Sequence, residues 1–111
     1  MKIELKINAD TVLAVNELLK NVYQMERTID KRQQVYRSIG FDLADKFDTK
    51  AKELVKKSTL FDAKKKHKIS LKFHEAWALE AILYELLHTT ENEYYKVLVA
   101  KVISHLNEKT A

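Results

Sequence analysis

Turn-forming residues are nearly absent from this chain, whose 111 residues include one glycine, Gly40, and no proline. β-Sandwiches and β-barrels need many tight turns, and most tight turns need glycine or proline. Glycine-rich phosphate loops and dinucleotide-binding fingerprints each need several glycines. The sequence therefore excludes these folds and sites and indicates a mostly helical protein.

The composition is that of an ordinary globular protein, with 46% hydrophobic and 32% charged residues. A length of 111 residues fits one domain, so we expect residues 1–111 to form a single domain. The absence of cysteine excludes disulfide scaffolds, thiolate zinc sites and cysteine nucleophiles.

Membrane and export segments are not indicated either. The most apolar stretch, residues 76–87, contains Glu80 and Glu85 and is shorter than the roughly 20 residues that a membrane span needs. Lys2 and Glu4 place charges where a secretory signal would be apolar. We therefore expect a cytoplasmic protein without membrane contact.

Two short segments, 2–7 and 68–73, alternate apolar with polar residues, which is typical of half-buried strands. A parallel pairing would set Lys2 against Lys68 and Lys6 against Lys72, and opposed like charges are destabilising. We therefore expect an antiparallel ribbon with Leu5 opposite Leu71, an arrangement that also places Ile3 beside Phe73, Ile7 beside Ile69 and Glu4 beside Lys72. Its free edges leave open whether the strands pair within one chain or between two copies.

Four helices are expected around this ribbon. The first has apolar residues at helical spacing from Val12 to Tyr23 and a capping side chain at Asn8 or Asp10. Beyond it the chain becomes more polar, and the helix either breaks in residues 24–34 or continues to about residue 39. Gly40 is expected at a helix end with a positive φ, with the second helix beginning near residue 42.

The third and fourth helices are expected at 75–88 and from about 90 onward. The third is apolar nearly all round, which is typical of a helix covered on several sides by neighbours or by a partner. The fourth opens with Thr90-Glu91-Asn92-Glu93, which matches a capping box. The fold class predicted is α+β, predominantly helical, with about four helices packed on a two-stranded antiparallel β-ribbon.

Charge is distributed unevenly along the chain. The total is +4, but residues 46–72 hold ten lysines against three acidic residues, whereas residues 73–111 hold three lysines against six glutamates. Lysines gathered in this way can bind the phosphates of a nucleic acid or an acidic protein partner. The residues that we select as candidate contacts are Lys56, Lys57, Lys64, Lys65, Lys66 and Lys68. Residues 46–72 contain no arginine, so we expect little sequence specificity.

No grouping of residues indicates catalysis, and we predict that the protein is not an enzyme and uses no cofactor. No serine has the surroundings of a nucleophile elbow, and no carboxylate pair is evident. Glu85 and His88 have the Glu-x-x-His spacing of di-iron sites, but such sites need two copies. His105 would lie near His74 and Glu75 if the last two helices are antiparallel. We predict no metal site.

Aromatic residues gather in the last two helices, where they can serve as core or as interface anchors. The candidates for an interface are Trp77, Tyr84, Tyr94 and Tyr95. Of these we expect Trp77 in the core and one tyrosine at an interface. The function predicted is a small non-catalytic interaction module that associates with itself as a homodimer or binds another protein. The alternative is a lysine-rich nucleic-acid-binding accessory protein.

Overall fold

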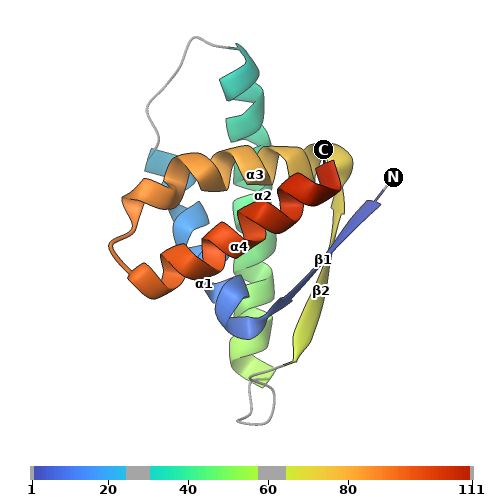
Figure 1. The fold of residues 1–111 in the computed structure, drawn as a ribbon, viewed down its shortest axis with the longest axis vertical. Coiled ribbons are helices and arrows are strands. Elements are labelled where there is room, and N and C mark those ends of the chain that lie inside the picture. The colour runs from blue at the N-terminus through green and yellow to red at the C-terminus, as the bar shows by residue number, and fades with distance from the viewer. Residues whose placement is uncertain (1, 25–30, 58–64, 111) are drawn as a thin grey trace.

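The computed structural model describes residues 2–24, 31–57 and 65–110. Its elements in chain order are β1 (Lys2–Asn8), α1 (Ala9–Leu19), the 3₁₀ helix η1 (Lys20–Gln24), α2 (Lys31–Lys57), β2 (Lys66–Lys72), α3 (Phe73–Leu86), the 3₁₀ helix η3 (Leu87–Thr89) and α4 (Glu93–Thr110). β1 and β2 form an antiparallel two-stranded sheet. The predicted fold class, α+β and predominantly helical, is confirmed (Figure 1).

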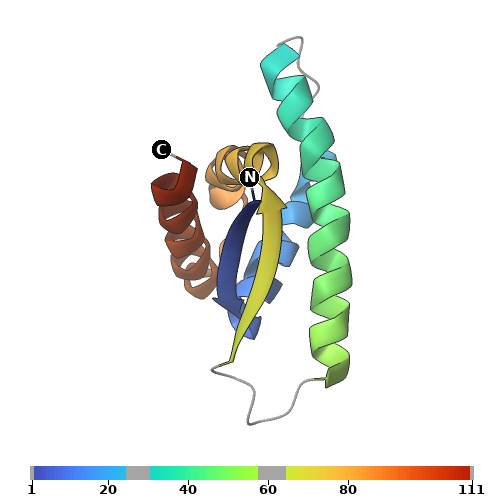
Figure 2. The same ribbon diagram turned by 90° about the vertical axis from the view of Figure 1, so that its right-hand side faces the viewer.

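The ribbon packs on the helices by one face only. The odd-numbered residues of both strands point inward, and Leu5 and Leu71 are completely buried against α1 and α3. In Figure 2 the opposite face of the ribbon is turned toward the viewer, with α4 along the β1 edge and α2 along the β2 edge. Both strands run directly into a helix, β1 into α1 and β2 into α3.

The predicted pairing was antiparallel, as observed, but the register was wrong by two residues. Leu71 lies opposite Ile3, and Leu5 lies opposite Ile69. Phe73 is not part of the strand, because the amide of Lys72 donates to Glu75 Oε1 at 2.8 Å and α3 begins at once. A shift of two residues keeps every side chain on its face, so the expected inner face is still the buried one.

Gly40 does not end a helix. It lies inside α2, and its φ is not positive. A Cβ at this position would lie 2.8 Å from Ile82 Cδ1 and 3.0 Å from Val22 Cγ2, so the missing side chain lets α2 approach α3 and η1 closely. The prediction of a helix beginning near residue 42 was wrong because close packing, not a turn, requires this glycine.

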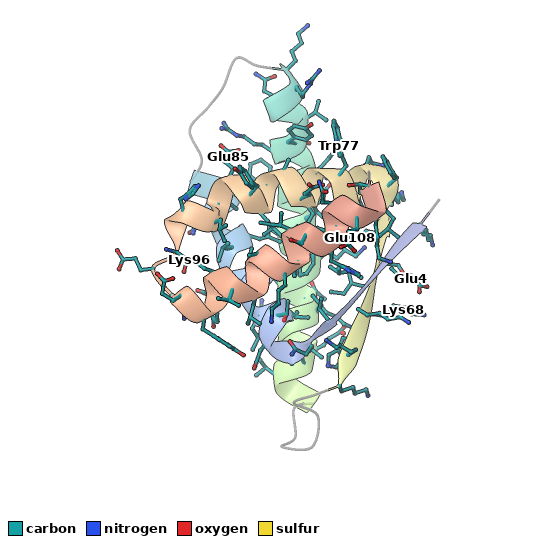
Figure 3. The ribbon with its side chains drawn as sticks, viewed as in Figure 1. Glu4, Lys68, Trp77, Glu85, Lys96 and Glu108 are labelled. Atoms are coloured by element: carbon teal, nitrogen blue, oxygen red, sulfur yellow. The ribbon has the colours of Figure 1, made fainter. Side chains whose placement is uncertain are left out.

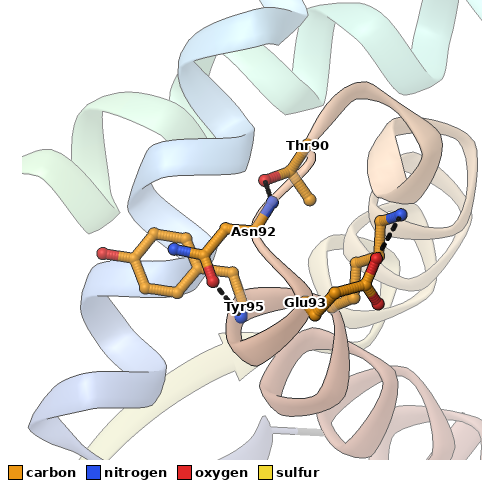
Figure 4. Close-up of polar contacts among 5 residues, drawn as sticks. Thr90, Asn92, Glu93 and Tyr95 are labelled. Carbon is orange, nitrogen blue, oxygen red and sulfur yellow. Dashed lines mark hydrogen bonds and ion pairs between the residues drawn. The ribbon is translucent and has the colours of Figure 1, made fainter.

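Two asparagines start helices. Asn8 Oδ1 accepts from Thr11 N at 2.9 Å, so Asn8 caps α1. Of the two caps expected from the sequence, Asn8 and Asp10, the first is therefore the one observed. In α4 the cap is Asn92, whose Oδ1 accepts from Tyr95 N at 3.1 Å, while Thr90 Oγ1 accepts from Asn92 N at 3.2 Å (Figure 4). The prediction that Thr90 caps this helix was therefore wrong, because the cap lies two residues later, at Asn92.

Substitutions at Gly40 test the packing between α2 and α3. We expect Gly40→Leu to lower the free energy of unfolding by about 3 kcal/mol, because the added side chain has no space against Ile82 and Val22. We expect Gly40→Ala to stay within about 1 kcal/mol of the parent, because higher helix propensity offsets displacement of the Ile82 terminal methyl. Urea unfolding measures both, and a Gly40→Leu protein as stable as the parent would contradict the packing described.

A contact between α4 and α1 gives a second prediction. The Tyr94 hydroxyl donates to Asp10 Oδ2 at 3.0 Å, and this hydrogen bond is the main cause that raises the pKa of Tyr94. The contact therefore contributes stability below the ordinary tyrosine pKa of about 10, and this contribution is lost as the pH rises through the raised value. In Asp10→Ala, Tyr94 should ionise at lower pH.

Absorbance at the tyrosinate band, recorded as the difference between each protein and its Tyr94→Phe counterpart, isolates this one group. Glu17→Ala provides the control, because Glu17 is an acidic residue of α1 that pairs with Lys20, and its loss should leave the Tyr94 curve unchanged. Identical Tyr94 curves with and without Asp10 would show that the hydrogen bond is not formed in solution.

Candidate functional site

The outer face of the ribbon is rich in lysine. Even-numbered residues of both strands point outward, and five of them are the exposed lysines Lys2, Lys6, Lys66, Lys68 and Lys72. We call these five residues, with Glu4 and Ser70 between them, the ribbon face. Five lysines and one glutamate give it a formal charge of +4. Within the described ranges no other element covers it (Figure 2).

Strand pairing brings these lysines together from distant parts of the sequence. Lys2 lies opposite Lys72, and Lys6 lies opposite Lys68. These are like-charge pairs of the kind that argued against a parallel ribbon, and they are destabilising. Glu4 reduces the repulsion, because its Oε1 lies 3.3 Å from Lys68 Nζ across the diagonal of the ladder (Figure 3). The arrangement is locally unfavourable, so fold stability does not explain it.

A pocket lies beside each edge of the ribbon. The pocket between β2 and α2 has a volume of about 270 Å³ and is lined by Lys46, Lys50, Glu53 and Lys68, among others. Lys46 Nζ donates to the carbonyl of Ser70 at 2.6 Å and so binds a backbone group of β2. The pocket between β1 and α4 has a volume of about 190 Å³, and its lining includes Lys6, Lys66, Lys101 and His105.

The predicted contact residues are only partly within the described ranges. Lys66 and Lys68 lie on the ribbon face, and Lys65 is exposed directly before β2. Lys64 and the side chains of Lys56 and Lys57 lie outside what the structure describes. Three lysines of the ribbon face, Lys2, Lys6 and Lys72, were not among the predicted contacts. Lys2 and Lys6 were missed because residues 1–45 have no net charge, although both occupy outward positions of the predicted first strand. Lys72 lies within the basic segment but was not selected.

The aromatic candidates are more exposed than expected. Trp77 is 46% exposed, so the prediction of a core position was wrong. The Trp77 and Tyr36 rings pack edge to face, with their centroids 4.9 Å apart, and this contact with α2 covers only part of the indole. Tyr84 and Tyr94 are 67% and 54% exposed, and Tyr95 is half-buried.

The outward side of α3 carries an aromatic stripe, which we define as Phe73, Trp77 and Tyr84. Steps of four and seven residues place all three on one side of the helix. Glu80 borders the stripe and accepts hydrogen bonds from Asn107 and Thr110 of α4. The expectation that neighbours cover α3 on several sides is confirmed, because α4, α2, α1 and β2 all contact it. The aromatic stripe is the side that they leave exposed within the described chain.

The histidines do not assemble into a ligand cluster. Among the described residues, no group of three histidine or acidic side chains lies close enough to hold a metal ion. The cluster of His74, Glu75 and His105 considered from the sequence is therefore not formed. His105 instead lines the pocket between β1 and α4.

Comparisons of this chain with protein-family models, with curated proteins and with solved structures find no match. None of the helices in the described ranges combines the length and apolar character needed to cross a membrane.

Removing a ribbon-face lysine should stabilise the fold. Lys6→Gln eliminates the opposition to Lys68 and should raise the free energy of unfolding by a few tenths of a kcal/mol at low ionic strength. The gain should vanish in about 1 M salt, where the Debye length is about 3 Å. Thermal unfolding at both salt concentrations measures it. Lys20→Gln, which breaks an ion pair with Glu17, is the control and should not stabilise.

Proposed function

We propose that this protein binds nucleic acid through the ribbon face, with little sequence specificity. The observation that carries the proposal is the set of five lysines on the uncovered side of a ribbon whose other side is core. Duplex DNA carries one negative charge per about 1.7 Å of its axis, and lysines that approach its phosphates release condensed counterions. Each strand of seven residues spans about 20 Å, so several phosphates face the ribbon at once.

The chemistry of the face favours phosphate contact over base reading. A two-stranded ribbon is small enough to enter the major groove, but base edges are read chiefly by arginine, asparagine and glutamine. The outward positions of the ribbon carry no arginine or glutamine, and Asn8 caps α1 with its side chain. Lysine ammonium groups act as point charges without the planar fork of arginine.

Lysines also protect free strand edges against pairing with another chain. That role accounts for less of the arrangement, because α2 and α4 already flank the two edges and Lys46 binds an edge carbonyl (Figure 2). Edge protection also does not require directly opposed lysines such as Lys2 and Lys72. Nucleic-acid binding accounts for both the number of lysines and their common face.

Binding to a fluorescent duplex of about 20 base pairs tests the proposal through its salt dependence. If all five lysines contact phosphates, log K should fall against log salt with a slope of about −4.5. The triple variant Lys6→Gln, Lys66→Gln, Lys72→Gln should reduce the magnitude of the slope by roughly 2 to 3 and weaken binding strongly at low salt.

The matched control replaces three lysines away from the ribbon, Lys20, Lys31 and Lys96, by glutamine and so changes the net charge equally. It should retain most of the slope. Absence of binding by the parent protein at low salt would refute the proposal, and so would equal losses in the two triple variants.

The aromatic stripe of α3 favours a second candidate function, self-association. Phe73, Trp77 and Tyr84 expose aromatic surface of the kind that anchors protein interfaces. Association through the ribbon edges is less favourable, because α4 and α2 flank these two edges (Figure 2). Sedimentation at tens of micromolar should then show a dimer that Trp77→Ala together with Tyr84→Ala disrupts. A monomeric parent protein would exclude this second function.

A further inference from the structure

The pocket between β1 and α4 differs from its counterpart at the other edge of the ribbon in how its charges are balanced. It is lined by Lys6 of β1, Lys66 of β2, and Lys101 and His105 of α4. No acidic residue lines it, and within the described chain the side chains of these three lysines have no ion-pair or hydrogen-bond partner. The pocket therefore gathers three uncompensated positive charges.

The lysines around the other pocket are largely engaged. Lys46 donates to the Ser70 carbonyl, Lys68 pairs with Glu4, and Glu53 contributes a negative charge to the lining. The two edges of the ribbon are therefore electrostatically unequal. The electrostatic attraction for an anion is therefore stronger at the α4 edge than at the α2 edge.

The surroundings of the three lysines strengthen their attraction for an anion. The inner wall of the pocket consists of the buried side chains Ile7, Leu98 and Val102, and Thr11 adds a hydroxyl. Charges beside an apolar wall are screened less than charges in open water. The Thr11 hydroxyl donates to Asn8 Oδ1 at 2.7 Å, so it belongs to the α1 cap and lends its oxygen only as an acceptor.

The arrangement of the lysines indicates the class of anion. Lys6 and Lys66 are diagonal neighbours on the outer face of the ribbon, whereas Lys101 comes from α4, so the lysines line the pocket from its ribbon side and from its helix side. A tetrahedral phosphate has oxygens on all sides and suits point charges placed around it, whereas a planar carboxylate is matched best by the fork of arginine. Phosphate is therefore the anion that this site fits.

We propose that the pocket between β1 and α4 binds one phosphate group of the nucleic acid that lies on the ribbon face. This inference rests on the proposed function and adds a direction to it. The nucleic acid crosses the β1 edge toward α4, not the β2 edge toward α2. Lys101, which lies outside both strands, becomes a contact residue.

Titration with inorganic phosphate tests the pocket by itself, with sodium chloride held at matched ionic strength as the reference. In amide NMR spectra, phosphate should shift the signals of Ile7, Lys66, Lys101 and His105 in a saturable way, and chloride should not. Lys101→Gln should weaken this response several-fold. If phosphate causes no shifts, or shifts the signals of lysines elsewhere equally, the proposal that this pocket binds phosphate is refuted.

Binding of the duplex to single variants tests the direction. At about 50 mM salt, Lys101→Gln should weaken binding about 10-fold, as expected for the loss of one phosphate contact. Lys96→Gln is the matched control on the same helix, because Lys96 pairs with Glu93 far from the ribbon (Figure 3). This variant loses no phosphate contact, so its affinity should change by less than about 2-fold. Lys46→Gln should likewise have the smaller effect.

The outcomes separate the two proposals. If the parent binds duplex and Lys101→Gln matches Lys96→Gln, the phosphate pocket is refuted as a contact while binding through the ribbon face stands. If the parent binds no duplex, the proposed function falls, and saturable phosphate shifts then support the pocket as an anion site alone. A larger loss in Lys46→Gln than in Lys101→Gln would reverse the assigned direction.

Discussion

Burial of one face of the β1–β2 ribbon is the constraint on which the rest of the structure depends. Leu5 and Leu71 are completely buried, and Ile3, Ile7 and Ile69 lie beside them on the same face. Because strand side chains alternate, burial of the odd-numbered residues forces every even-numbered residue outward. The core and the lysine-rich face are therefore two consequences of a single pairing. A shift of one residue in the pairing would turn one strand over, which would bury the lysines of that strand and expose its apolar side chains.

The same pairing explains why charge counted along the sequence describes the surface only partly. Residues 46–72 are strongly basic, and the ribbon face takes Lys66, Lys68 and Lys72 from them. Its other two lysines come from residues 1–45, whose charges cancel. Lys101 comes from a segment with net negative charge, yet it lies beside Lys6 at the β1 edge. The basic surface is made by tertiary contacts among segments of different net charge.

Local patterns in the sequence were sufficient for the fold class but not for how its elements meet. Alternation identified both strands, and Asn8 was one of two short polar residues, with Asp10, expected to cap the first helix. Register depends on where α3 begins, which a Glu75 hydrogen bond sets, and alternation alone does not distinguish shifts of two residues. Gly40 was misread because a glycine that permits close helix packing has the same sequence signal as one that ends a helix. Trp77 was misread because its contact with Tyr36 leaves nearly half of the indole open.

Lysine footprinting tests the central claim, that the outer side of the ribbon is the surface that meets nucleic acid. The protein is acetylated briefly with and without duplex DNA, and the modification of each lysine is measured by mass spectrometry. The account predicts that duplex protects Lys2, Lys6, Lys66, Lys68 and Lys72 and leaves Lys20, Lys31 and Lys96 as reactive as before. Protection of the second group, or equal protection of all lysines, would contradict it.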